Sequence, residues 1–142
     1  MGDNYRQMEQ YTDAINSYTK AIEIDETYRE PYLLCAEVCN ILGYYQVAID
    51  IVKKSIEVTT RHYNWVERVD CWREKPYDIL ALSYYNLEDG VNAYINGLVA
   101  YNMNPNDERI KNNLKYYKEV FERCVEDTDG IKLLLDQYAP NF

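Results

Sequence analysis

The chain has 142 residues, of which 15 are Lys or Arg and 24 are Asp or Glu, so its formal net charge at pH 7 is −9. This length predicts one domain with room for a continuous core. The acidic balance argues against nucleic acid as a partner, because binding duplex phosphates requires a basic face that releases counterions. No apolar run approaches the roughly 20 residues that span a bilayer, and the polar N-terminus lacks the apolar core of a signal peptide. We therefore expect a cytoplasmic protein with no membrane partner.

The first predicted helix covers residues 13–24 and ends at an acidic turn. Its side chains recur 34 positions later, where Tyr11, Ala14, Ile15, Lys20, Ile22 and Glu23 correspond to Tyr45, Ala48, Ile49, Lys54, Ile56 and Glu57. A fixed period of this length indicates stacked two-helix repeats. Residues 1–27 are then a partial first repeat, in which Tyr11 opens the second helix and the first helix would precede Met1. We expect a fragment or truncated form with more chain upstream, or else a frayed N-terminal cap.

Residues 28–60 form the predicted second repeat, with helices over 28–42 and 45–58. Pro31 fits near a helix start, where its missing N–H costs nothing. Gly43 separates the two helices, because glycine readily takes the left-handed conformation that ends a helix. The two helices therefore form an antiparallel pair.

An insertion follows, because Pro76-Tyr77 comes 45 positions after Pro31-Tyr32, 11 more than the period. Residues 61–74 hold both tryptophans and the only histidine. Exposed aromatic side chains beside arginines anchor protein partners or stack on sugars, which makes Tyr63, Trp65 and Trp72 candidate binding residues. Alternatively, the tryptophans fill the gap left by the longer connection and hold it on the core. His62 is not predicted to be a catalytic base, since no nucleophile and carboxylate partner can be assigned to it.

Residues 75–105 form the third repeat. One helix carries Tyr77, Leu80, Ala81 and Tyr84, and the next carries Ala93, Gly97 and Ala100 before Pro105. Small side chains at these positions let antiparallel helices approach closely. The pattern resembles the tetratricopeptide repeat (TPR), with Gly97 where an aromatic residue is usual. The resemblance implies an all-α fold of helical hairpins stacked in a right-handed superhelix.

Residues 106–142 are predicted to be capping helices. A helix over 106–124 has an apolar face of Ile110, Leu114, Tyr117, Val120 and Phe121 and a polar opposite face, as the end of a stack requires. A short helix over 131–138 follows and stops at Pro140. The run 127–129 reads Asp-Thr-Asp, a pattern with which some glycosyltransferases hold a divalent ion. Without a strand or nucleotide-binding framework around it, we interpret this run as a helix cap with an acidic first turn.

The four cysteines and the remaining motifs give no sign of a metal centre, a cofactor or catalysis. Cys35 and Cys39 fall on helix positions that face a neighbouring helix, and Cys71, Cys124 and His62 do not complete a metal site at a usual spacing. We interpret the cysteines as buried free thiols, which behave as small apolar side chains. No phosphate-binding loop, nucleophile elbow or paired-ligand helix is present, so we expect no cofactor, no metal and no activity from this chain alone.

The TPR resemblance also implies a binding surface, because the first helix of each pair lines the concave side of the stack, where TPR domains bind extended peptides. The positions carried over from the family are Glu37, Asn40, Lys75, Asp78, Leu82, Tyr85, Asn86, Arg109, Asn112 and Tyr116. Leu33 and Asp78 stand where chaperone-binding TPR domains carry lysines, so recognition of a C-terminal carboxylate of that kind is disfavoured.

A narrower resemblance covers residues 29–117. The segments REPYLLCAEV, KPYDILALSYYNL and NMNPNDERIKNNLKYY, with the long aromatic connection between the first two, are similar to the helical region that follows the catalytic domain in family 2 glycosyltransferases. The nucleotide-sugar domain of those enzymes is absent from this chain. The resemblance implies a noncatalytic accessory module that presents a protein or glycan acceptor. Two alternatives are a free-standing scaffold that binds peptides, and a self-association module that forms a homodimer through an exposed face at Tyr11, Ile15 and Tyr18.

Overall fold

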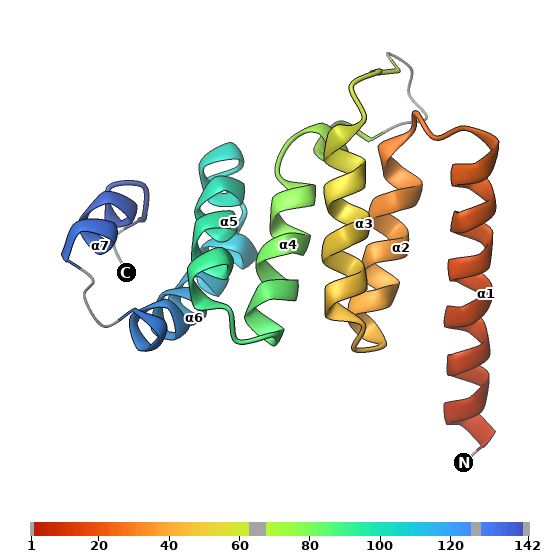
Figure 1. The fold of residues 1–142 in the computed structure, drawn as a ribbon, viewed down its shortest axis with the longest axis horizontal. Coiled ribbons are helices and arrows are strands. Elements are labelled where there is room, and N and C mark those ends of the chain that lie inside the picture. Colours follow the sequence, from red (N-terminus) through yellow and green to blue (C-terminus); the bar gives the residue numbers. More distant parts are fainter. Residues whose placement is uncertain (1, 63–67, 126–128, 141–142) are drawn as a thin grey trace.

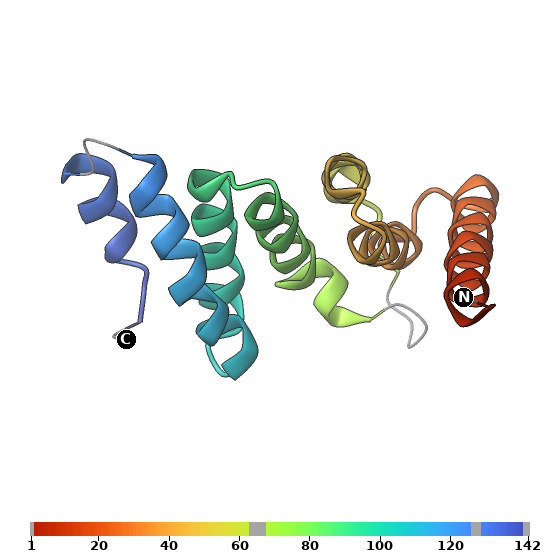
Figure 2. The ribbon, with the colours of Figure 1, turned by 90° about the horizontal axis from the view of Figure 1, so that it is seen from below.

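The structure is a computed structural model, which describes residues 2–62, 68–125 and 129–140. Within these residues the chain forms seven α-helices, one short 3-10 helix and no strand. The helices follow one another along an elongated row, and the two chain ends lie at opposite ends of it (Figures 1 and 2). The prediction of an all-α fold built from helical hairpins is confirmed.

Several helix boundaries lie at glycine or proline residues. The elements are α1 (Gly2–Ile24), α2 (Arg29–Ile41), α3 (Tyr45–Glu57), the 3-10 helix η1 (Val69–Trp72), α4 (Lys75–Asn86), α5 (Gly90–Met103), α6 (Glu108–Cys124) and α7 (Asp129–Asp136). Pro76 lies in the first turn of α4, where a proline leaves no hydrogen bond unmade. Gly43 has a φ of +83° between α2 and α3, as predicted for the residue that ends a helix.

Helix α1 is longer than the sequence interpretation allowed. It runs without a break for 23 residues, so the prediction that Tyr11 opens a helix is wrong. The reason is local: after Gly2 the segment contains no glycine or proline that would end a helix before Ile24. Residues 2–10 therefore belong to α1 and do not form a turn ahead of it.

The described core consists of two clusters that share α4. The first joins α2, α3 and the start of α4 around Leu33, Ile49 and Val52. The second joins α4, α5 and α6 around Tyr94, Leu114 and Phe121. Because α4 contributes Leu80 to one cluster and Ala81 to the other, it connects the two halves of the stack.

Two glycines allow α5 to pack closely against α6. A Cβ at Gly97 would lie 2.6 Å from the Tyr117 ring, and one at Gly90 would lie 2.5 Å from backbone atoms of Val120 and Phe121. Ala93 and Ala100 are fully buried on the same helix. The small side chains thus permit a close helix crossing, but for the two glycines the neighbour is α6 and not the other helix of the predicted third repeat.

Arg29 helps to hold the described part of the insertion on the core. Arg29 stacks its guanidinium 3.9 Å from the centre of the Trp72 ring and donates hydrogen bonds to the carbonyls of Ile56, Val58 and Cys71. Trp72 itself packs against the first core cluster. For Trp72, this packing favours the interpretation in which an aromatic side chain fixes the longer connection.

A second contact ties the insertion to the turn between α1 and α2. The imidazole of His62 stacks on Tyr28 with ring centres 3.8 Å apart, and its Nε2 lies 2.8 Å from the hydroxyl of Thr27. That hydroxyl donates to Asp25 at 2.5 Å, so it accepts from His62 and cannot also give the imidazole a proton. These contacts anchor the start of the insertion to the turn between α1 and α2.

Among the described cysteines, three fit the interpretation as buried thiols and one does not. Cys35, Cys39 and Cys71 are buried, whereas Cys124 is exposed at the end of α6. All four are free. In the described chain, no helix is both long enough and apolar enough to cross a bilayer.

Candidate functional site

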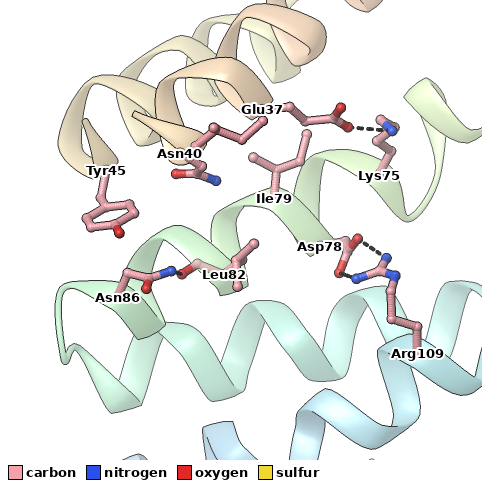
Figure 3. Close-up of a pocket in the computed structure, with 10 residues that line it drawn as sticks. Glu37, Asn40, Tyr45, Lys75, Asp78, Ile79, Leu82, Asn86 and Arg109 are labelled. Carbon is pink, nitrogen blue, oxygen red and sulfur yellow. Dashed lines mark hydrogen bonds and ion pairs between the residues drawn. The ribbon is translucent and has the colours of Figure 1, made fainter. Parts of the chain in front are cut away.

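A groove of about 570 Å³ runs across three alternate helices of the stack. Its walls come from α2, α4 and α6, with one residue from the start of α3 (Figure 3). The lining residues are Glu37, Asn40, Ile41, Tyr45, Lys75, Asp78, Ile79, Leu82, Asn86 and Arg109. We call this surface the α2–α4–α6 groove.

Seven of the ten predicted groove residues line this surface. They are Glu37, Asn40, Lys75, Asp78, Leu82, Asn86 and Arg109. Tyr85 instead packs edge-on against Tyr117, with ring centres 5.5 Å apart, and borders a separate hollow near Cys124. Asn112 and Tyr116 are exposed on α6 and do not line the groove.

Two ion pairs bridge the helices of the groove. Lys75 Nζ at the start of α4 lies 2.5 Å from Glu37 Oε1 on α2. Asp78, one turn further along α4, accepts hydrogen bonds from both terminal nitrogens of Arg109 on α6. Such a two-point pairing fixes the guanidinium plane. These hydrogen bonds raise the pKa of Arg109 further above its usual range, so its guanidinium stays charged at ordinary pH.

The position of Arg109 follows from how α6 begins. Asp107 caps the helix, since its carboxylate accepts hydrogen bonds from the backbone N–H groups of Arg109 and Ile110 at 3.0 and 3.2 Å. Capping fixes the backbone of the first turn of α6, from which the Arg109 side chain reaches Asp78. The Asn-Asp-Glu-Arg segment thus serves both the helix start and the groove.

Two asparagines supply amide groups. Asn40 Oδ1 lies 2.8 Å from the hydroxyl of Ser83, a fully buried residue of α4, and this contact holds the amide of Asn40 between α2 and α4. Asn86 donates from its amide nitrogen to the carbonyl of Leu82 at 2.8 Å, which leaves its amide oxygen to accept a hydrogen bond (Figure 3). Both amides are thus held in place before any ligand arrives.

Apolar side chains complete the groove. Ile79 is buried in the floor, while Leu82 and Ile41 are 40% and 62% exposed. Half-buried Tyr45 closes one end (Figure 3). The sequence assigned Tyr45 only to the repeat pattern. Tyr45 comes directly after the Gly43 turn, where α3 starts beside the groove. That position in the sequence could have indicated that Tyr45 lines the groove.

The candidate binding residues of the insertion are not brought into the groove. Trp72 is half-buried against the core and Arg29, and it does not line the groove. Tyr63 and Trp65 lie outside the described residues, as do Asp127 and Thr128 of the acidic run. Leu33, noted above as replacing a family lysine, is fully buried in the core, so it cannot meet a ligand.

A second, apolar hollow lies at the other end of the stack. It measures about 470 Å³ between α5 and α7 and is lined by Ile95, Leu98, Val99, Asn102, Met103, Leu135 and Tyr138. Exposed Leu133 and Leu134 lie on α7. By contrast, Ile15 and Tyr18 pack against the first core cluster, so the prediction that they form an exposed face on α1 is wrong.

The architecture is that of a helical-hairpin repeat domain with a groove across α2, α4 and α6. A family model described as a TPR repeat matches residues 2–39, which cover α1 and most of α2. The match supports a TPR-type domain, a class that mediates protein–protein interactions. None of the curated proteins matches this sequence.

Proposed function

We propose that this chain is a noncatalytic protein-interaction module that binds an extended peptide in the α2–α4–α6 groove. The observation that carries the proposal is the groove itself, which spans three successive first helices and combines fixed amides, ion pairs and apolar side chains. An extended peptide exposes backbone N–H and C=O groups that Asn40 and Asn86 can bind, and its side chains can contact Leu82 and Ile41. The free thiols support action in the cytoplasm, where thiols are kept reduced.

The experiment is selection of a displayed peptide library on the immobilised full chain, followed by titration of the selected peptides. We expect Leu82→Glu to weaken binding about tenfold or more, because it places an unpaired charge against the ligand's apolar side chain. Leu87→Glu is the matched control, since Leu87 is 43% exposed just after the same helix but does not line the groove. Equal loss of affinity in both variants, or failure to select any peptide, would contradict the proposal.

A finer proposal is that the module serves a family 2 glycosyltransferase by presenting a protein or glycan acceptor. It rests on the resemblance of residues 29–117, whose distinctive positions have physical roles here: Arg29 holds the insertion, Pro76 begins α4 and Arg109 pairs with Asp78. The test is the mass of the protein made from its native locus, compared with 16.9 kDa. A much larger product containing a nucleotide-sugar domain supports the proposal, and a product of this size removes its basis.

Self-association is the second candidate function, now through α5 and α7. A twofold interface uses the same patch on both copies, and this patch has a hollow beside protruding side chains: Leu133 and Leu134 are 69% and 56% exposed. We expect Leu134→Lys to shift a dimer to monomer in sedimentation velocity. Monomeric wild-type protein at about 100 µM would exclude this candidate, since stable homodimers associate well below that concentration.

A further inference from the structure

The two ion pairs of the α2–α4–α6 groove are unequally exposed. In the first pair the acid is the more exposed member, since the Glu37 side chain is 39% exposed and Lys75 is 22% exposed. In the second pair the base is the more exposed member, with Arg109 58% exposed and Asp78 18% exposed. An approaching ligand therefore meets one outward negative charge and one outward positive charge.

These outward charges stand on opposite walls. Glu37 belongs to α2 and Arg109 to α6, while their inner partners Lys75 and Asp78 both belong to the first turns of α4 between them (Figure 3). The four charges sum to zero, in contrast to the −9 of the whole chain. The groove is thus locally neutral but polarised from one wall to the other.

We propose that the groove selects peptides carrying both a basic and an acidic side chain, the basic one beside Glu37 and the acidic one beside Arg109. This inference rests on the proposed function and adds the charge class of the ligand. A ligand of one sign gains at one wall and is repelled at the other, whereas a mixed-charge ligand gains at both. The inner partners Lys75 and Asp78 keep the outward groups in place, so the ligand does not have to order them.

The competing expectation is that an acidic protein favours basic peptides. Attraction by the net charge acts over long distances and is screened beyond about 8 Å at physiological ionic strength. Contacts with Glu37 and Arg109 act within a few ångströms and are screened less. At physiological salt, the local pattern therefore decides the selection.

The test uses four series of capped synthetic peptides with one common leucine and two variable positions, titrated against the full chain at about 0.15 M salt, the physiological ionic strength. The variable pair is Lys with Glu, Lys with Lys, Glu with Glu or Gln with Gln, and the spacing between its members is scanned. We expect the best Lys/Glu peptide to bind about three- to tenfold more tightly than the best peptide of each single-sign series, since an exposed pair contributes about 1.4- to 5-fold. Tightest binding by Lys/Lys, or equal binding by Gln/Gln, would overturn the charge selection while leaving the peptide groove in place.

Two charge-exchange variants sharpen the test because each keeps the net charge and the ion pair. Glu37→Lys with Lys75→Glu makes both outward charges positive, and we expect the preference to change to Glu/Glu. Asp78→Arg with Arg109→Asp makes both outward charges negative, and the preference should change to Lys/Lys. Helical circular dichroism checks that each variant folds. Unchanged preference in both folded variants refutes the inference, and absence of binding by all four series to the wild type refutes the proposed function with it.

Discussion

Arg29 shows how one side chain can fix a long connection. Its guanidinium covers the face of Trp72 and donates hydrogen bonds to carbonyls at the end of α3 and in η1. It therefore satisfies backbone acceptors at the end of α3 and holds the insertion at the same time. A lysine has a single point charge and cannot stack and bridge in the same way. The value of Arg29 lies in the planar shape of its charged group.

We predict that Arg29→Lys lowers the free energy of unfolding by about 2–3 kcal/mol, because several charge-assisted hydrogen bonds and the stacking contact are lost together. The measurement is urea unfolding followed by circular dichroism. Arg68→Lys is the matched control: its side chain is 61% exposed and pairs locally with Asp70, so a change within about 0.5 kcal/mol is expected. A loss at position 68 as large as at position 29 would rule out the specific role of Arg29.

Gly90 provides a second prediction. Gly90→Ala places a Cβ 2.5 Å from backbone atoms of α6, which cannot move aside as a side chain can, so we expect a loss of about 2–4 kcal/mol. Gly130→Ala, early in α7, meets no atom within 4 Å and should be neutral or stabilising by up to about 1 kcal/mol. Thermal unfolding of both variants compares them directly. Similar melting temperatures would show that α5 and α6 separate more easily than the contact implies.

At the level of elements, α7 is attached by the packing of Leu135 on the second core cluster and by several polar contacts. Asp136 accepts a hydrogen bond from the Tyr94 hydroxyl at 3.1 Å and lies 3.6 Å from Lys118 Nζ, while Asn102 donates to the carbonyl of Tyr138 at 3.0 Å. Tyr94 is buried in the second core cluster, and this burial is the main reason that the pKa of its phenol is raised. Asp136 therefore links the short terminal helix to the core.

We predict that Asp136→Ala releases α7 without unfolding the rest of the stack. The substitution leaves the buried Tyr94 hydroxyl without this acceptor, a cost of about 1–3 kcal/mol. Limited proteolysis should cut the α7 region faster, while amide hydrogen exchange in α2–α4 stays at the wild-type rate. The matched control is Gln137→Ala, at the neighbouring exposed position, which should leave both measurements unchanged. Faster exchange throughout α2–α4 in the Asp136 variant would instead indicate a single cooperative unit.

Several elements were predictable because local chemistry defines their ends. Glycine and proline commonly mark turns or helix starts, as Gly43, Pro76 and Pro105 do here. The 34-residue period relates α1 to α3. The described ends of the α3–α4 connection followed no such rule, since the contacts of Val58, Cys71 and Trp72 depend on Arg29, far away in sequence. The pairing of Glu37 with Lys75 and of Asp78 with Arg109 was equally hidden, because each pair joins residues far apart in the chain. The repeat pattern placed these residues on one surface but did not reveal which charge faces outward.

For the whole molecule, the raised pKa values predict loss of stability in alkali. Burial raises the pKa of the Cys35 thiol to about 11, and it also raises the pKa values of Tyr32, Tyr94 and Tyr117. Between about pH 9 and 11 the unfolded chain therefore loses protons that the folded chain keeps, so the unfolded state gains stability relative to the folded state as pH rises.

We expect the urea midpoint to be unaffected by these groups up to about pH 8.5 and to fall from about pH 9 upward. Cys35→Ala removes the thiol contribution, so the decline between about pH 9 and 10 should become shallower in that variant, even though its midpoint at neutral pH is lower. Cys124→Ala is the control, because Cys124 is exposed. A wild-type midpoint that stays level to about pH 10.5 would contradict this prediction.

The groove helices α2, α4 and α6 pack mainly against the intervening α3 and α5, and only sparsely against one another. The direct links across the groove include the two ion pairs and the Ser83–Asn40 contact, so its width is set chiefly by how the groove helices pack on α3 and α5. Substitutions on the hidden sides of α3 and α5 should then tune its width from a distance. Ligands of different bulk would be accommodated by bending of the whole stack at α3 and α5.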